Sequence, residues 1–439
     1  MNSTSRPFYL GIDLGTSYFK AGLFDESLRL AGLGRVPVPN SGDGTATSEV
    51  RAEDFWQAVG GAIKGALAEA NAEASDIAAL SWSSQANSFL LLDAENKPLT
   101  PLVLWNDIRT GAIPLPVKRL GDRADFAAVT GAGGPTSEYH AVAKIDWFRT
   151  ERPDIWSRTA RIATIADYLA LGLSGEHKVD AATAAMLGIL DLRALSWWPQ
   201  GLGELGLSTS LFATPVRSGT IIGTISADGA TRVSLPGLEG AKVIAGTLDH
   251  IAAALGAGLG EVASVSESTG TVLACVRNTD RFEPTVGITT LPGIENGTYS
   301  LLTYDPNGAG ILEWYHNQFA PTTSFAELDK LAAAVPPDCD GLVMGDMPQL
   351  REGLSGFTGA TDVTGHGHYA RAIMSAVSDR LGVLLANLHV AKSERIVATG
   401  GGARSPFWLQ LKRDRLGIDI IPASCTEPAC RGAARLASL

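Results

Sequence analysis

Two short segments combine glycine, hydroxyl and charged side chains in a way that suits phosphate binding. The first, DLGTSYFK, spans residues 13–20, and the second, SESTGT, spans residues 266–271. A turn that contains glycine lets backbone N–H groups approach an anion, because no Cβ blocks the way. In the first segment, further groups for an anion come from the Thr16 hydroxyl and the Lys20 ammonium. Each segment alone is also compatible with a plain β-turn.

The first segment begins with a carboxylate, Asp13, at the end of an apolar run. Such a side chain can hold Mg²⁺ directly or through water, since hard cations with phosphate partners prefer oxygen ligands. The second segment repeats the turn as Gly270 and Thr271. The repetition favours two turns that bind the β- and γ-phosphates of a nucleotide.

Two glycine-rich turns follow in the second half of the chain. ATGGGARSP, residues 398–406, lies between an apolar run and a helical pattern. It is not GxGxxG, the glycine pattern that a dinucleotide fold needs. It therefore favours an adenosine site over an NAD site, with a loose loop as the alternative. In NGAG, residues 307–310, Gly310 either faces the nucleotide or simply turns the chain.

Two other segments carry polar groups that suit an alcohol substrate. In AGTLDH, Asp249 follows a glycine turn at a strand-to-helix junction. There it can accept a hydroxyl proton, or it can be an ordinary helix N-cap. In WNDIR, Trp105 and Asp107 offer an indole face and a carboxylate, as a sugar site uses. The alternative is a capped strand end with a surface Asp–Arg pair.

The composition excludes several other classes of protein. The net charge of −11 over 439 residues argues against a nucleic-acid partner, which usually leaves a basic footprint. Four cysteines are too sparse for a disulfide framework, and the seven histidines show no HExxH spacing. No stretch approaches 18 apolar residues, so we expect no membrane span and a cytoplasmic location.

Apolar patterning indicates an α/β protein with an internal duplication. Strands near 8–13, 17–24 and 28–33 form a meander, and Phe55, Val59 and Ile63 mark one face of a helix. Strand, Gly-Thr turn and strand recur in VASVSESTGTVLACV. RIATIADYLALGLSG is interpreted as a helix that ends at Gly175, and a hinge is expected near 245–255.

In their order, DLGTSYFK, WNDIR, AGTLDH, STGT and GGGARSP resemble the FGGY family of carbohydrate kinases, within the actin/hexokinase-type ATPase superfamily. The segment that ends in WNDIR is similar to the xylulose-kinase branch. The resemblance implies two domains of a duplicated ribonuclease-H-like fold with an interdomain cleft. It assigns residues 1–248 to the sugar and phosphate side and residues 249–439 to the adenosine and phosphate side.

The resemblance also implies ATP-dependent phosphorylation of a small sugar or polyol, with Mg²⁺. Asp249 then falls on the catalytic position and Asp13 on the metal-linked one. The nucleotide side is formed by Thr16, Ser17, Lys20, Gly270, Thr271, Gly310, Gly401, Gly402 and Ala403. The sugar side is formed by Gln85, Asn87, Trp105, Asp107 and Tyr139.

Three departures from the family's pattern leave the sugar unnamed. Gln85-Ala86-Asn87 replaces the triplets of both glycerol kinases and xylulose kinases, and MPQLREGLSGFTG stands where Gly-Glu-Arg-x-Pro is common. The chain also stops soon after Glu427, where many members of the family continue, so the family's oligomer contacts cannot be assumed and a homodimer is left open. A chaperone-like ATP-binding protein is one alternative, against which Asp249, WNDIR and Tyr139 favour the kinase. An inactive sugar-responsive paralogue is the second alternative, and the unusual Gln85–Asn87 segment leaves it open.

Overall fold

The computed structural model describes residues 7–43, 45–345 and 353–439, which form two compact units. The first unit comprises Met1–Gly256, Thr279–Ser300 and Glu427–Leu439, and the second comprises Ala257–Asn278 and Leu301–Thr426. The C-terminal segment thus belongs to the first unit. A functional division at residue 248 stays a prediction. Residues 346–352, which include all but the last residue of the unusual MPQLREG stretch, lie outside the described residues.

The main sheet of the first unit is mixed and has the strand order β13-β14-β5-β1-β2-β3, with β15 also on β5. Its strands are β1 (Phe8–Leu14), β2 (Tyr18–Phe24), β3 (Leu30–Pro37), β5 (Ile77–Ser84), β13 (Ile221–Thr224), β14 (Lys242–Ile244) and β15 (Thr247–Leu248). β1 is antiparallel to β2 and parallel to β5. The carboxyl ends of β1, β5 and β15 therefore meet at one edge.

Helix α1 (Ala52–Ala70) covers one face of this sheet and packs on β2 and β3. It forms there because its apolar residues recur every four positions and are buried, as Phe55, Val59 and Ile63 show. Asn71 ends the helix in the left-handed conformation. The expected meander and this helix are confirmed.

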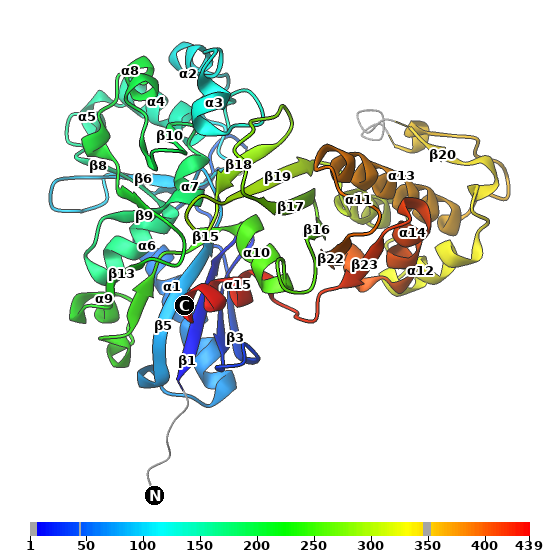
Figure 1. Ribbon diagram of the computed structural model, residues 1–439, viewed down its shortest axis with the longest axis horizontal. Coiled ribbons are helices and arrows are strands. Elements are labelled where there is room, and N and C mark those ends of the chain that lie inside the picture. Colours follow the sequence, from blue (N-terminus) through cyan, green and yellow to red (C-terminus); the bar gives the residue numbers. More distant parts are fainter. Residues whose placement is uncertain (1–6, 44, 346–352) are drawn as a thin grey trace, which may run out of the picture. The chain divides into compact units, whose positions relative to one another are not determined.

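The C-terminal helix α15 (Pro428–Ala437) packs on β1 and β5 of the same sheet (Figure 1). Its backbone comes so close to β1 that a Cβ on Gly11 would lie 1.9 Å from the carbonyl oxygen of Cys430. Likewise, a Cβ on Gly432 would lie 1.8 Å from the carbonyl oxygen of Ala252, in helix α10 (Asp249–Ala257). Only glycine permits this packing.

The second unit repeats the topology of the first. Its sheet includes the order β19-β17-β16-β22-β23. The strands are β16 (Val265–Thr269), β17 (Leu273–Thr279), β19 (Tyr299–Asp305), β22 (Arg395–Thr399) and β23 (Asp419–Pro422). β16 is antiparallel to β17 and parallel to β22, as β1 is to β2 and β5. The expected α/β fold with an internal duplication is confirmed.

The helices of the second unit are α11 (Gly310–Phe319), α12 (Phe325–Ala334), α13 (His366–Asn387) and α14 (Pro406–Leu416). α13 packs on α12 and α14, and α14 packs on β23. A two-stranded sheet joins β20 (Val343–Met344) to β21 (Phe357–Thr358). The strand, turn and helix predicted around the 398–406 glycines are present as β22, the short segment Gly401–Arg404 and α14.

One predicted helix in the first unit is wrong at its start. Residues 161–164 form strand β8 (Arg161–Thr164), and helix α6 (Ile165–Ser174) begins only after them. Thr164 caps α6, because its side chain accepts from the backbone N–H of Asp167 while that carboxylate accepts from the N–H of Thr164. β8 also pairs with a neighbouring strand, which stabilises the extended conformation.

A second sheet of the first unit has the order β4-β7-β6-β8, formed with β4 (Glu49–Val50), β6 (Phe89–Leu92) and β7 (Leu102–Val103). Short elements complete this unit: α2 (Leu115–Gly121), α3 (Phe126–Thr130), α4 (Ala141–Glu151), α5 (Pro153–Trp156), β9 (Lys178–Asp180), α7 (Ala181–Ala185), β10 (Leu190–Asp191), β11 (Ser196–Trp197), α8 (Pro199–Leu205), β12 (Thr214–Val216), α9 (Ala227–Arg232) and β18 (Thr289–Pro292).

Candidate active site

The first Gly-Thr turn joins β1 to β2 and places Asp13 opposite Lys20 in the antiparallel register. Asp13 is 7% exposed, and its Oδ1 accepts a hydrogen bond from Ser83 Oγ at 2.9 Å. Its Oδ2 lies 3.8 Å from Lys20 Nζ. Burial raises the pKa of Asp13 to about 6, although Lys20 and Ser83 act in the opposite direction. The carboxylate therefore lacks full compensation by a cation.

Lys20, predicted to contact a nucleotide, is held by a residue that sequence reasoning missed. Its Nζ donates to Glu427 Oε2 at 2.9 Å, and Glu427 Oε1 accepts from Arg35 Nη2 at 3.3 Å. Glu427 immediately precedes α15, so the docking of that helix on β1 brings it here. No local pattern marks this pairing, because 407 positions separate Glu427 from Lys20.

Asp249 lies near Asp13, as the strand register requires. Leu248 of β15 and Leu14 of β1 both align with Ser84 of β5, one on each side. Asp249 follows Leu248, begins α10 and is half-buried. Its charge contributes to the raised pKa of Asp13, so the two carboxylates share one electrostatic environment.

An aromatic pair adjoins the same turn. Trp105 donates its indole N–H to Thr16 Oγ1 at 2.9 Å, and its ring centroid lies 6.3 Å from that of Tyr139. The two side chains are 39% and 44% exposed. Thr16 and Ser17 are exposed as well. The structure thus brings together the predicted aromatic sugar residues and the hydroxyls of the first turn.

The polar residues predicted for the sugar are engaged within the fold. Gln85 is buried, donates from Nε2 to the carbonyl oxygen of Gly15 at 3.3 Å and accepts from Ser88 Oγ at 3.2 Å. Asn87 has a left-handed backbone with φ of 59°, and its Oδ1 accepts from the N–H of Ala141 at 3.0 Å. Asn87 is thus half-buried, whereas Gln85 is buried.

Asp107 has no exposed surface in this structure. Its Oδ2 accepts from the N–H of Ser48 at 2.8 Å and from Arg109 Nη2 at 2.7 Å, and its Oδ1 accepts from Arg109 Nε at 2.8 Å. These hydrogen bonds hold the pKa of Asp107 below its usual value, although burial acts in the opposite direction. Asp107 therefore braces the loop, and a direct contact with a sugar stays a prediction.

Three glycine segments predicted for the nucleotide converge in the second unit. The N–H of Gly308 donates to the carbonyl oxygen of Thr271 at 3.1 Å, and a Cβ on Gly310 would lie 3.0 Å from the same oxygen. Gly400 has a φ of 81°, and a Cβ there would lie 2.6 Å from the carbonyl of Thr269. The loop that follows is the short helix Gly401–Arg404, with Gly402 buried and Gly401 exposed.

A buried ion pair supports these segments, and sequence reasoning missed it. Lys412 Nζ donates to Glu267 Oε1 and to Thr269 Oγ1, each at 2.6 Å. All three residues are fully buried. Because Thr269 precedes the second Gly-Thr turn, this pair connects α14 to the turn. Lys412 begins a run of four charged residues, and charged residues on a helix usually face solvent, so the sequence offered no signal.

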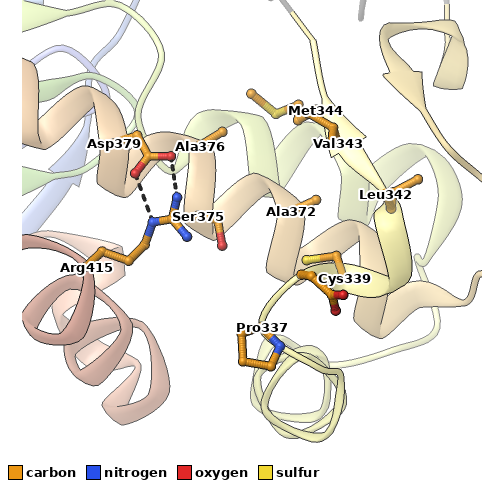
Figure 2. A pocket seen from close by; sticks show the side chains of 11 residues that line it. Pro337, Cys339, Leu342, Val343, Met344, Ala372, Ser375, Ala376, Asp379 and Arg415 are labelled. Carbon is orange, nitrogen blue, oxygen red and sulfur yellow. Dashed lines mark hydrogen bonds and ion pairs between the residues drawn. The ribbon is translucent and has the colours of Figure 1, made fainter.

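The second unit also contains an open hollow that lies apart from every predicted site residue. Pro337, Leu342 and Ala372 contribute to its lining, and the ion pair between Asp379 and Arg415 lies at one side (Figure 2). Among the described residues, no group of three or more His, Cys, Asp or Glu side chains could hold a metal ion. Of the helices that the structure describes, none is long and apolar enough to cross a bilayer.

Comparison with known proteins places the chain in a family of enzymes that phosphorylate alcohols. The chain belongs to the FGGY family of carbohydrate kinases: residues 8–256 match the N-terminal domain of that family, and residues 308–439 match its C-terminal domain. It is thus an ATP-dependent carbohydrate kinase, a phosphotransferase with an alcohol group as acceptor. The resemblance inferred from the motifs is confirmed.

Similar proteins extend over nearly the whole chain. A xylulose kinase of Lactococcus lactis is 28% identical, with 98% of this chain and 87% of the relative covered. A gluconokinase of Bacillus subtilis is 25% identical, with 97% and 86% covered. A crystal structure of a "xyloylose kinase" from Brucella ovis has a TM-score of 0.83 at 26% identity and covers 98% of this chain and 90% of that one.

Proposed function

We propose that this kinase transfers the γ-phosphoryl group of ATP to a hydroxyl of a small ketose or polyol, with a ketopentose such as xylulose preferred. The hydrogen bond from Trp105 to Thr16 carries the proposal, because it sets a half-exposed aromatic face directly beside the first Gly-Thr turn. A sugar on that face would present a hydroxyl close to phosphate. The xylulose kinase of Lactococcus lactis, similar over 98% of this chain, supports the same class.

In this proposal Asp249 accepts the proton of the attacking hydroxyl. It is half-buried at the start of α10 and follows β15, which lies in the same sheet as β1, the strand that carries Asp13. General-base catalysis requires such a carboxylate within hydrogen-bond reach of the acceptor. Thr16 and Ser17 of one turn, and Gly270 and Thr271 of the other, supply donors for phosphate. Gly401, Gly402 and Ala403 seat the adenosine, with Gly310 beside them.

Asp13 fits a role in holding Mg²⁺. Its Oδ2 has Lys20 Nζ at 3.8 Å, beyond hydrogen-bond length, and burial has already raised its pKa. Mg²⁺ typically takes one or two carboxylates and completes its shell with water and phosphate oxygens. A single buried carboxylate beside the proposed phosphate turn is consistent with this coordination of Mg²⁺. The ion would neutralise charge that builds up on the phosphate oxygens during transfer.

A panel of acceptors tests the substrate class. Purified enzyme would be given D-xylulose, L-xylulose, gluconate, glycerol and a ketohexose, with ADP release measured by a coupled assay. We expect the highest kcat/KM for a ketopentose. A preference for gluconate or glycerol would overturn the ketose assignment, and ADP release equal to that of Asp249→Asn with every acceptor would favour the inactive paralogue.

A further inference from the structure

A buried lysine that the mechanism does not use lies next to the proposed sugar site. Lys144, in α4, is fully buried, and its Nζ donates to three backbone carbonyl oxygens rather than to a carboxylate. The distances are 3.1 Å to Leu104, 2.9 Å to Trp105 and 3.1 Å to Tyr139. An ammonium group has three N–H donors, so each carbonyl has its own donor. A buried cation must be compensated in some such way.

The three carbonyls belong to two separate segments. Leu104 and Trp105 follow β7, whereas Tyr139 lies just before α4. Both exposed aromatic residues, Trp105 and Tyr139, therefore have their backbones bound to one nitrogen. Their rings lie 6.3 Å apart at an interplanar angle of 46°. Lys144 Nζ is thus bound to the backbones of both residues of the ring pair.

Two further hydrogen bonds hold these segments. The N–H of Trp105 donates to Ser88 Oγ at 2.9 Å, and the N–H of Ala141 donates to Asn87 Oδ1 at 3.0 Å. Each of these bonds fixes one segment alone. Asn87 and Ser88 are adjacent, so together they also tie the two segments to each other. Lys144 Nζ is, among the contacts described, the single hydrogen-bonding atom that binds a residue of each segment.

We propose that Lys144 is a positioning residue for the sugar: it holds Trp105 and Tyr139 in register as the two aromatic walls of the acceptor site. This inference rests on the proposed function, because it assumes that the pair contacts the acceptor. Lys144 itself touches neither sugar nor ATP. Its removal would therefore weaken sugar binding through the aromatic pair and leave nucleotide binding largely unaffected.

The test is Lys144→Met, which keeps the length of the side chain and removes its donors. We expect KM for the preferred sugar to rise about tenfold or more, since small displacements of positioning groups have large effects. KM for ATP should change less than twofold, on the order of experimental error. Lys64→Met, at an exposed position of α1, is the matched control and should change neither value. Lys144→Gln, which keeps two N–H donors, should fall between wild type and Met, and it carries the test if Lys144→Met does not fold.

A double-mutant cycle separates positioning from general loss of structure. In a Trp105→Ala background, Lys144→Met should raise the sugar KM by much less than it does alone, because one residue acts through the other. Fully additive effects, or an equal rise in KM for ATP, would overturn the role of Lys144. If Trp105→Ala and Tyr139→Ala each leave the sugar KM unchanged, the aromatic sugar site is itself wrong and the inference falls with it.

Discussion

Glu427 and Lys20, at opposite ends of the chain, are joined by a hydrogen bond of 2.9 Å between carboxylate and ammonium. The same ammonium lies 3.8 Å from Asp13 Oδ2. The residue before the C-terminal helix thus competes with Asp13 for the cation that follows the first Gly-Thr turn. Lys20 Nζ is thus within hydrogen-bond distance of Glu427 and beyond it from Asp13 Oδ2.

Glu427→Gln should weaken the use of Mg²⁺. Without its negative partner, Lys20 is free to pair with Asp13 and to compete with the ion. We expect the Mg²⁺ concentration that gives half-maximal activity to rise by roughly threefold or more, as for a partly exposed charge pair. A Mg²⁺ titration at fixed ATP measures this. Glu26→Gln, at an exposed position of the same unit, is the control. A curve that superimposes on wild type would show that Glu427 only anchors the helix.

Asp13→Ala removes the proposed ligand itself. The variant should need more Mg²⁺ and bind ATP more weakly, while its affinity for the sugar changes little. Equilibrium binding of each ligand, measured by calorimetry with and without Mg²⁺, checks the difference. Equal losses for ATP and sugar would point to collapse of the turn and not to loss of a metal ligand.

Asp249→Asn should leave ATP and sugar binding nearly intact and lower kcat by on the order of 100-fold or more, as expected when a general base is lost. The amide is isosteric and can still accept from the N–H of His250, a bond of 2.7 Å in the structure. The helix start should therefore persist, which circular dichroism would verify. Turnover close to wild type would remove Asp249 from the mechanism.

Lys412→Met should destabilise the second unit strongly, because it leaves Glu267 charged, buried and unpaired. Breaking such a pair costs about 3–5 kcal/mol. The double variant Lys412→Met, Glu267→Leu removes both charges and should regain most of that stability. Urea unfolding of the three proteins gives the comparison. A double variant no more stable than the single one would show that packing around Trp408, and not charge pairing, dominates.

The stability of the protein should depend on pH through Lys144. Burial lowers its pKa to about 7 from the ordinary 10.5, with Arg109 acting in the same direction and Asp107 in the opposite one. His140, at the start of the same helix, also has a pKa lowered by burial, with Lys144 contributing. Between about pH 7 and pH 10.5, Lys144 is protonated in the unfolded chain and has released its proton in the folded chain. Unfolding free energy therefore rises with pH in that window and is flat below it.

Relative to Lys144→Met, wild type should gain up to about 1.4 kcal/mol per pH unit from pH 7 to pH 9. Urea unfolding at several pH values, with the two proteins side by side, measures this difference. A difference that stays constant over the window would mean that the three carbonyls keep Lys144 protonated in the folded state.

The sequence by itself determined the α/β class, the duplicated strand-turn-strand pattern and the family. Each depends on local features: the glycine and threonine of a turn are adjacent in the chain, and apolar periodicity reflects which face an element buries. That is why the hairpins at Gly15-Thr16 and Gly270-Thr271 were predicted correctly. The start of α6 was not, because a short apolar segment fits a strand or a helix until a neighbouring strand pairs with it.

Only the tertiary structure decided what the polar side chains contact. Glu427 and Lys20 meet because α15 packs on β1. Lys412 reaches Glu267 because α14 packs on the sheet of the second unit. Asp107, predicted to face a sugar, is enclosed by Ser48 and Arg109. A hydrogen bond depends on distances of a few tenths of an ångström between segments far apart in sequence. The spacing of residues along the chain does not determine such distances, so these partners can be identified only once the sheets and helices are assembled.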